Sequence, residues 1–570
     1  MHRKIILLTI ALLPLFVLGQ RKKFQVNGAA RAYFFANTLD IADDIDTVTT
    51  RAANYGQTLL DLGISVFPNK NTEVLGMFRI RNDLGGFWGG GVSFNVRQLT
   101  LKGVAGNVVR YELGDIDLSM TPYTLWNFRE EGVVNEADVF ALRRDIVYYD
   151  MFYIDDNWRM QGGRAAFGLE FANVIEGIEF DGFLTRQRPA SGTTEPERLY
   201  GGGTVTLRQS DDLSLAFHSV NIFDLAATIP DSILYKNNVH TLELNYTRDL
   251  NENVAVGLSA EAGVSSARYI NYTDPRAPEA QNEWFYDAGI TTGLKKLGIT
   301  AKLAYKDVGA DFLSPGAQTK RIDYSRFPGL YQQFTNAGIG RPVSYADFIS
   351  GNTENSFRIS EQLLPYFSAY ANTNPYGLAT PNRRGIYLDA ERTDSTKFRS
   401  SFLRVAALTQ SRGTGTDELK NFLLVEAGTD LYLNDFWGGE KDLKLDLGLR
   451  FENTSRGGEV FETIDLTSTF IDAGLSWEFV PRLDALAGAK VWSVSGNSFV
   501  NARNRFNLIE NFETVNYDFT ENALAAGLRY RFKGDNTLSA QYQRSSIAHA
   551  DEALADYAIS QMTILFSLNF

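Results

Sequence analysis

The sequence of 570 residues contains no cysteine and only four histidines. Without cysteine, the chain can form neither a disulfide bond nor the thioether that anchors a lipoprotein, and it lacks the thiolate and clustered imidazole ligands of most transition-metal sites. We therefore expect no cofactor and no metal centre of that kind. Proline is also scarce, with fifteen residues in all, and no linker rich in proline or serine divides the chain into domains.

Long hydrophobic runs are equally scarce. After a basic start, one apolar run of fourteen residues ends at Leu18. Pro14 interrupts it, and a transmembrane helix needs about twenty apolar residues, so the pattern is typical of a secretory signal peptide rather than of an uncleaved anchor. We predict a signal peptide at residues 1–19, cleaved near Gly19, and a single domain at residues 20–570. Because that domain has no run long enough for a membrane helix, any membrane crossing must use β-strands.

Aromatic residues and glycine, by contrast, are abundant, with 39 Phe, 26 Tyr and 49 Gly. Aromatic side chains suit the pleated surface of a sheet, and glycine suits turns and crowded strand positions. Many segments alternate apolar and polar residues with the period of two that indicates a strand, among them 443–451 (LKLDLGLRF), 471–479 (IDAGLSWEF) and 523–532 (ALAAGLRYRF). The composition therefore favours an all-β protein.

The two faces of these segments differ in kind. One face carries rows of leucine and aromatic residues, such as Leu443, Leu445 and Leu447, and the other carries Lys, Arg, Asp, Glu and Gly. A soluble β-sandwich also alternates, but a uniformly apolar face opposed to a mixed charged face indicates strands with lipid outside and water inside. Because strands can cross lipid only when they close into a barrel, we predict a single closed transmembrane antiparallel β-barrel.

Short and long connections alternate along the chain. Short turns are predicted at 68–71, 105–107, 210–212, 251–253, 480–482 and 533–536, with longer polar loops between them. In bacterial barrels the short turns are periplasmic and the long loops extracellular, and on that rule we count about 22 strands within a range of about 18–22. Residues 119–156 and 309–392 are expected to be long loops or inserts folded into the lumen. Within the second, we expect a partly helical piece at 360–372 and a returning strand at 384–392.

The chain ends on the strand pattern MTILFSLNF, with an aromatic residue last. A terminal apolar strand would be an aggregation-prone edge in a soluble protein, whereas in a closed barrel it pairs with the first strand. The pattern, and Phe566, Leu568 and Phe570 in particular, resembles the Gram-negative outer-membrane β-barrel superfamily. The loops, rich in Asn, Asp and aromatic residues, are similar to those of Bacteroidota barrels. The resemblance implies a location in the cell outer membrane, contact with its lipid, and recognition of these three residues by the barrel-insertion machinery.

Placing the apolar rows outward sends charged residues into the lumen. They are basic on the early strands and acidic on the later ones: Arg79, Arg81, Arg97, Arg110 and Arg164 against Glu426, Asp430, Asp446, Asp472 and Glu478. If these walls face each other across water, they set up a transverse field that orients polar solutes, a feature similar to the constriction zone of general porins. The alternative is that they pair into a salt-bridged, non-conducting filling. We take these ten residues as candidates for solute selectivity.

The insert at 309–392 is rich in aromatic residues. Folded inward it would narrow the pore; folded outward, its rings could stack on a glycan or bind a protein partner; a third option is that the rings only pack a small core of the loop itself. An acidic stretch with Asp40, Asp43, Asp44 and Asp46 could bind Ca²⁺ through carboxylate oxygens. Since it lacks the spacing of a calcium-binding hand, a solvated acidic loop is the simpler interpretation.

No catalytic constellation is evident in the sequence. His218 and Ser219 are neighbours on a predicted strand and point to opposite faces, so they cannot form the hydrogen bond between a base and its nucleophile. We expect neither enzymatic activity nor a nucleic-acid partner. The leading hypothesis is a porin-like channel for passive transport of small polar solutes through a charged lumen. The alternative is a non-conducting barrel that serves as a structural or docking subunit of a surface or secretion complex, and a barrel-embedded enzyme is a minor third hypothesis.

Overall fold

The computed structural model describes residues 23–41, 52–84, 92–126, 135–142, 144, 160–172, 174–192, 195–226, 228–229, 233–270, 280–318, 361, 363, 366–393, 398–504, 508–534, 536–551 and 554–570. The predicted signal peptide at residues 1–19 lies outside this part of the chain.

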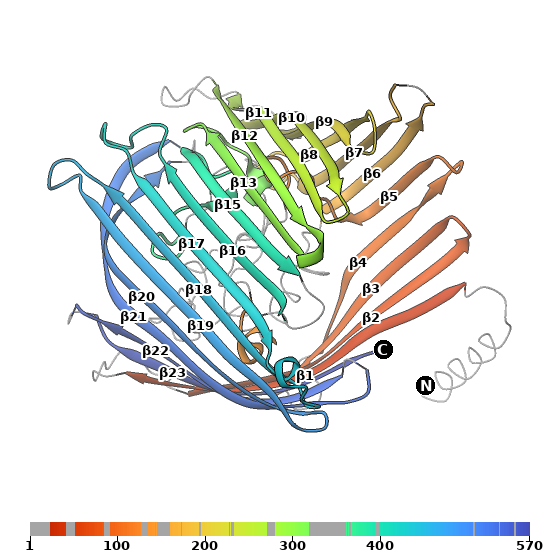
Figure 1. Cartoon of the computed structure of the whole chain (residues 1–570). Helices are drawn as coiled ribbons and strands as arrows, with labels where there is room; N and C mark the ends of the chain where they lie inside the picture. The colour runs from red at the N-terminus through yellow and green to blue at the C-terminus, as the bar shows by residue number, and fades with distance from the viewer. Residues whose placement is uncertain are drawn as a thin grey trace.

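Within the described residues, 22 strands form one antiparallel sheet (Figure 1). The strands are β1 (Phe24–Ile41), β2 (Ala52–Asn69), β3 (Thr72–Asp83), β4 (Val92–Ala105), β5 (Val109–Ile116), β6 (Met160–Glu170), β7 (Gly177–Arg188), β8 (Arg198–Arg208), β9 (Leu213–Asp224), β10 (Leu234–Asn251), β11 (Val254–Ile270), β12 (Gln281–Leu294), β13 (Ile299–Val308), β15 (Arg383–Thr393), β16 (Phe398–Thr409), β17 (Asn421–Tyr432), β18 (Leu443–Arg456), β19 (Ile464–Val480), β20 (Leu483–Arg503), β21 (Ile509–Arg531), β22 (Thr537–His549) and β23 (Tyr557–Asn569). A short strand, β14 (Pro375–Leu378), lies outside the sheet, and short helical turns form η2 (Lys295–Leu297), η3 (Pro315–Gln318) and α4 (Asn434–Trp437).

The sheet closes on itself because the last strand pairs with the first. β23 runs antiparallel to β1 from Ala29 opposite Asn569 to Ile41 opposite Tyr557. The backbone of Phe570 continues the ladder, with hydrogen bonds of 2.9 and 3.0 Å to Gly28. The terminal apolar strand therefore has no free edge, and the predicted closed antiparallel β-barrel is confirmed, with a strand number at the upper end of the expected range.

The outer surface of the barrel is apolar, as the alternation predicts. Leu524 is 62% exposed and Trp477 is 47% exposed, and they belong to rows of outward leucines and aromatics on most strands. The opposite face of the same strands buries polar and charged groups, among them Asp472 and Lys490. A belt of exposed large apolar side chains around a polar interior is the arrangement of a barrel surrounded by lipid. No helix in the described part of the chain is both long and apolar enough to span a membrane.

The two ends of the barrel differ. All six predicted short turns lie at one end, the turn end, together with the start of β1 and the end of β23. The longer connections lie at the other end, the loop end. There β20 and β21 rise above their neighbours as a two-stranded extension, because β19 pairs with β20 only as far as Gly496 and β22 pairs with β21 only as far as Phe519.

The structure refines the expectations for the two inserts. The connections run between β5 and β6 and between β13 and β15, and the predicted returning strand at 384–392 is confirmed as β15. The partly helical piece expected at 360–372 is wrong for the described residues 366–372, which form a single turn at 368–370. The helix does not continue because the amide N–H of Asn372 is taken by Glu452 of the barrel wall, at 2.9 Å.

Candidate functional site

The first feature of the lumen is a pair of inward segments, residues 117–126 and 309–317. The Tyr123 ring stacks on Phe285 of β12 with 4.0 Å between centroids, and its hydroxyl donates to Asp287 at 2.8 Å. The two segments also bind each other, since the Trp126 amide donates to the Gly316 carbonyl at 3.1 Å. Together with the wall from β5 to β13 they bury one apolar cluster: Ile116, Leu118, Tyr123, Leu125, Met160, Phe183, Tyr200, Val220, Ile222, Tyr235, Val239, Ala267, Phe285, Val308, Phe312, Leu313, Ala317 and Ala379.

A second inward segment, residues 135–142 with Arg144, packs against β18 to β21. Two glycines of the wall make room for it: a Cβ at Gly474 would lie 2.1 Å from the Ala137 Cβ, and one at Gly488 would lie 2.7 Å from Val139 and Phe140. At Gly474 the close atom is fixed to the backbone, so a larger residue must displace the segment; at Gly488 the side chains of Val139 and Phe140 must shift.

Ion pairs hold the same segment in place. Asp138 accepts hydrogen bonds from Lys444 and Arg529, each at 2.9 Å. Glu136 pairs with Arg144 at 2.8 Å and with Lys490. Burial opposes the charge of Glu136, but these two cations outweigh it and lower the pKa of its carboxyl to about 2. The segment is therefore anchored by carboxylates that stay ionised at neutral pH.

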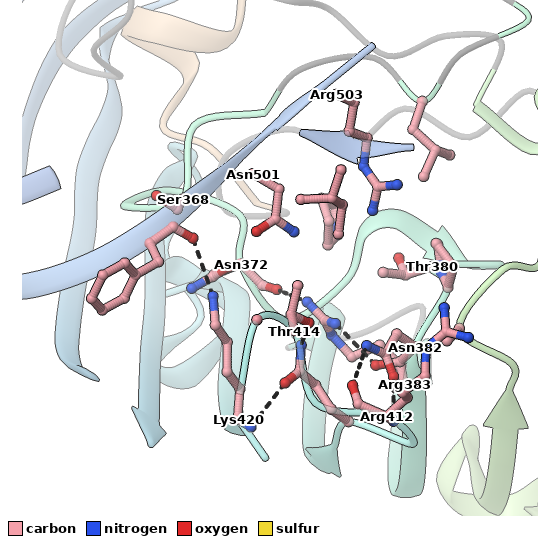
Figure 2. A pocket seen from close by; sticks show the side chains of 18 of the residues that line it. Ser368, Asn372, Thr380, Asn382, Arg383, Arg412, Thr414, Lys420, Asn501 and Arg503 are labelled. Atoms are coloured by element: carbon pink, nitrogen blue, oxygen red, sulfur yellow. Dashed lines mark hydrogen bonds between the residues drawn. The ribbon is translucent and has the colours of Figure 1, made fainter. Parts of the chain in front are cut away.

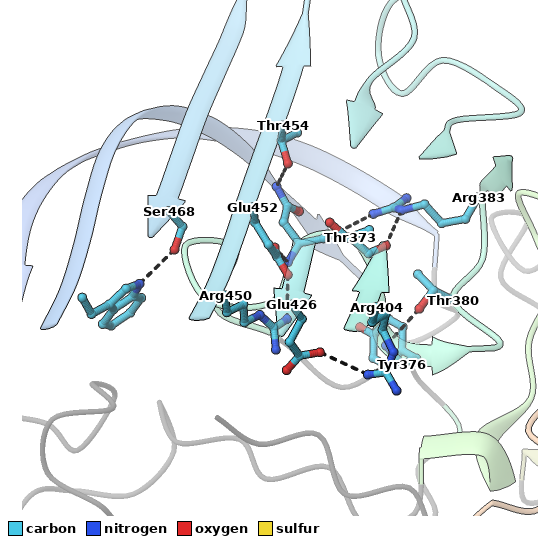
Figure 3. A network of polar contacts seen from close by, with 12 residues as sticks. Thr373, Tyr376, Thr380, Arg383, Arg404, Glu426, Arg450, Glu452, Thr454 and Ser468 are labelled. Carbon is cyan, nitrogen blue, oxygen red and sulfur yellow. Dashed lines mark hydrogen bonds and ion pairs between the residues drawn. The ribbon is translucent and has the colours of Figure 1, made fainter. Parts of the chain in front are cut away.

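A third inward segment, residues 366–382, carries aromatic residues of the long insert. Phe367 and Tyr370 pack edge-on against Trp492 of β20, with 5.8 and 5.9 Å between ring centroids. The Asn372 side chain donates to Thr454 at 2.9 Å. Thr454 and Glu452 belong to the polar network shown in Figure 3. These rings fold into the lumen and pack against the wall, rather than outward; the insert's other residues between 319 and 360 lie outside the described part of the chain.

Four of the five predicted basic residues lie on the inward face next to a carboxylate. Arg79 donates to both carboxylate oxygens of Asp61 on β2, at 2.7 and 2.6 Å, and Arg97 donates to the same carboxylate at 3.1 Å. All three side chains are buried. Arg81 lies 3.7 Å from Asp83. A shared buried carboxylate therefore balances two of the five basic candidates.

A cavity of about 690 Å³ lies near the turn end, beneath Leu118 of the inward segment 117–126. It is lined by the other two basic candidates, Arg110 and Arg164. Arg164 donates from its Nε to Asp181 at 2.9 Å. His218 also lines this cavity, and its Nε2 lies 3.0 Å from Glu243.

Four of the five predicted acidic residues are likewise paired with a cation. Glu426 accepts from Arg404 at 3.2 Å, Asp446 lies 2.7 Å from Lys444, Asp472 lies 3.4 Å from Lys490 and Glu478 lies 3.1 Å from Arg531. Asp430 accepts a hydrogen bond from the Ser400 hydroxyl at 3.1 Å.

Sequence reasoning found the inward face of these strands but missed the partners. Asp61 stands directly opposite Arg79 in the β2–β3 register, and Lys490 stands opposite Asp472 in the β19–β20 register. The only available signal was that Asp61 and Lys490 also fall on the polar face of their own strands. Where a neighbour balances the charge, as at Arg79, Arg97 and Asp472, the field of the wall is short-ranged.

A second cavity, of about 480 Å³, lies at the loop end of the lumen, and Figure 2 shows its labelled side chains converging. We call it the loop-end pocket. It lies between the third inward segment, the connection at 410–420 and the β20–β21 extension. Its lining includes Tyr366, Asn372, Tyr376, Asn382, Arg383, Gln410, Arg412, Lys420, Phe422, Phe499, Asn501, Arg503 and Phe512.

The connection at 410–420 is held by amide side chains. The Asn382 Oδ1 accepts from the backbone of Ser411 at 2.8 Å and of Arg412 at 2.9 Å. The Gln410 Oε1 accepts from the Lys420 amide at 3.0 Å. Arg412 forms a bidentate pair with Asp311, at 2.6 and 2.9 Å. This scaffold places Lys420 at the inner wall of the pocket.

Lys420 is only 6% exposed and donates from its Nζ to the Phe499 carbonyl at 3.2 Å. Burial, and then the neighbouring Arg383 and Arg456, lower its pKa to about 7. Within the described residues Lys420 forms no ion pair with a carboxylate. No sequence pattern points to this residue, because it lies in a connection, outside the strand alternation.

The acidic stretch near residue 40 is only partly described. Asp40 accepts a hydrogen bond from Arg544 at 3.0 Å. Asp43, Asp44 and Asp46 lie outside the described residues, and within the described ranges no group of three or more His, Cys, Asp or Glu could hold a metal ion.

No family model matches this chain, and no curated protein matches it. Among solved structures, similar chains include Pseudomonas aeruginosa OccK8 (OprE), with 10% identity, 96% of this chain and 98% of that chain covered and a TM-score of 0.36. The outer membrane protein opdK from Pseudomonas aeruginosa has 9% identity, 96% and 99% coverage and a TM-score of 0.32. Acinetobacter baumannii OccAB1 has 9% identity, 96% and 97% coverage and a TM-score of 0.32. Similarities this distant assign neither a family nor a solute, and they give no support to the resemblance to Bacteroidota barrels.

Proposed function

We propose that this chain is a channel of the Gram-negative outer membrane that conducts small polar solutes passively through its lumen. The observation that carries the proposal is the opposition of its two faces. The outer face is apolar on strand after strand, and the inner face is charged and borders cavities of about 480 and 690 Å³. Polar and charged side chains on the inner face can take the place of the water around a polar solute. The closed ladder meanwhile keeps the backbone groups of the strands from facing lipid unpaired.

Conductance of the purified protein in a planar lipid bilayer tests this function. Arg79 and Arg97 are buried around one carboxylate, so replacing them would damage the wall itself. Arg81 is a better probe, because its side chain is 25% exposed and its carboxylate partner is 3.7 Å away. Arg81→Glu should shift the reversal potential toward cation selectivity. Lys295→Gln, a change of an exposed lysine at the turn end, is the control and should leave it unchanged.

A second candidate function is a non-conducting barrel that docks other proteins. The supporting observation is the apolar cluster that residues 117–126 and 309–317 bury against the wall from β5 to β13. A lumen filled in this way can act as a rigid support without a pore. Absence of ion current from folded protein, together with a partner protein that copurifies in defined stoichiometry, would favour this candidate over the channel.

Assembly of the barrel also belongs to the proposal. Phe566 and Leu568 stand on β23 opposite Ala32 and Ala30 of β1, and Phe570 is 53% exposed at the turn end. We infer that these three residues form the signal that the barrel-insertion machinery reads. Removing Phe570 should reduce the fraction of protein that reaches the outer membrane, measured by cell fractionation, while a Leu524→Val change elsewhere on the outer face should not.

A further inference from the structure

Buried positive charge without a matching carboxylate gathers around the loop-end pocket. Arg383, Lys420 and Arg456 are 5%, 6% and 5% exposed. Arg456 donates to the Glu462 carbonyl at 2.6 Å, and Arg383 donates to the carbonyls of the third inward segment. Within the described residues these three cations bond to carbonyl oxygens, and Arg383 also to the Tyr366 side chain, but none forms an ion pair. The carboxylates of Glu418 and Glu462 favour the charge of Arg456, and that of Glu452 favours the charge of Arg383, without a direct ion pair.

The carboxylate that lines this pocket is already engaged. Asp311 holds Arg412 in a bidentate pair, at 2.6 and 2.9 Å. A buried charge without a counterion costs several kcal/mol unless something compensates it. At Asp61, by contrast, the wall supplies the carboxylate for two buried arginines. Among the described residues, the excess of positive charge at the loop-end pocket therefore leaves a place for an anionic ligand.

Several neutral polar groups of the pocket are already engaged, although the Asn501 Oδ1 has no hydrogen-bond partner among the described residues. Asn382 and Gln410 hold the connection at 410–420, and Asn372 binds the wall at Glu452 and Thr454. A neutral hydroxylated solute would therefore find few free partners here. The remaining surface is aromatic. The Arg383 guanidinium lies 3.7 Å from the centroid of the Phe422 ring, and the rings of Phe499 and Phe512 line the same space.

We propose that the loop-end pocket binds a small organic anion, with its carboxylate or phosphate between Arg383 and Lys420 and its apolar body against Phe422 and Phe512. An arginine stacked on a ring and fixed by backbone carbonyls presents its remaining N–H groups in a set direction, which suits a planar or tetrahedral oxyanion. A desolvated lysine supplies the second charge. This site deepens the proposed channel function. The role of the anion as a transported solute rests on that function.

Calorimetric titration of the folded protein in detergent tests the site with four probes: phenylacetate, phenyl phosphate, inorganic phosphate and the neutral phenylacetamide. Phenylacetate or phenyl phosphate should bind, and the one that binds more tightly identifies the acidic group. Lys420→Met should weaken that binding by about tenfold or more, the contribution of one charge-assisted hydrogen bond. Arg383→Gln should weaken it similarly, and Lys295→Gln, the exposed control, should not change it.

Three results would overturn the inference: equal binding of phenylacetamide, binding of inorganic phosphate as tight as that of the phenyl compounds, or unchanged affinity in Lys420→Met. If Arg383→Gln fails to fold, Lys420→Met still decides, because it keeps the length of the buried side chain. The binding measurement is independent of conduction. A protein that conducts but binds no probe refutes this inference and leaves the channel function intact, whereas one that binds a probe but carries no current refutes the channel and not the site.

Discussion

The docking of residues 135–142 against the barrel wall can be tested with one methyl group. Gly474→Ala adds a Cβ that would lie 2.1 Å from the Cβ of Ala137. The obstructing atom is attached directly to the backbone of the segment, so no side-chain rotation relieves the contact. The segment must move away from β19, and its ion pairs with the wall must lengthen.

The size of the effect follows from what the segment buries. Val139 and Phe140 are 2% and 1% exposed, and burying side chains of this kind stabilises the docked state by about 1.5–3 kcal/mol each. Adding a methyl group to a filled site costs about 1–3 kcal/mol. The penalty of the added methyl group is smaller than the stabilisation from burying Val139 and Phe140. We therefore expect the segment to remain docked on average but to open about tenfold to a hundredfold more often.

Thiol labelling measures this opening directly, because the chain has no cysteine of its own. A Val139→Cys change provides one thiol inside the docked segment. When Gly474→Ala is added, the rate at which this thiol reacts with a maleimide should rise by about tenfold to a hundredfold. The mean single-channel current should rise in the same double variant if the segment narrows the pore.

Gly168→Ala is the matched control. It makes the same change on a luminal face, but its Cβ would lie 3.7 Å from the Glu179 side chain, an ordinary contact. If Gly168→Ala and Gly474→Ala accelerate labelling equally, or if neither does, the close approach of Ala137 to the wall is not what holds the segment, and the reasoning is refuted.

Two further predictions concern charge. Asp61→Asn leaves two buried arginines without their shared carboxylate and should destabilise the barrel by about 3–5 kcal/mol, seen as a lower urea midpoint; an unchanged midpoint would contradict the proposed role of this pair. Binding of phenylacetate at the loop-end pocket should be strong at pH 6 and weaken as the pH rises above 7. Its carboxylate stays charged over this range, while Lys420, whose pKa burial and the cations Arg383 and Arg456 lower to about 7, loses its proton; affinity that is flat from pH 6 to 8 would argue against Lys420 as a ligand.

The sequence alone predicted what depends on local order. Alternation with a period of two assigns each residue of a strand to the lipid or the lumen without knowledge of the neighbouring strands, so Trp477 and Leu524 were correctly placed outside and Asp472 inside. Turn residues between such segments marked the short connections and, through them, the strand number. The final aromatic strand predicted closure, because an apolar strand at the end of the chain needs a partner.

Only the tertiary structure decided which charges meet and what fills the barrel. The pairs of Asp138 with Lys444 and Arg529 join residues hundreds of positions apart, and no local pattern encodes such a contact. In the sequence Gly474 cannot be told from other small luminal residues; only the fold shows that Ala137 packs against it. The buried charge of Lys420 likewise arises where a connection, an inward segment and the β20–β21 extension meet. Strand direction is a property of a few consecutive residues, whereas burial and ion pairing belong to the folded assembly of segments that the chain brings together from a distance.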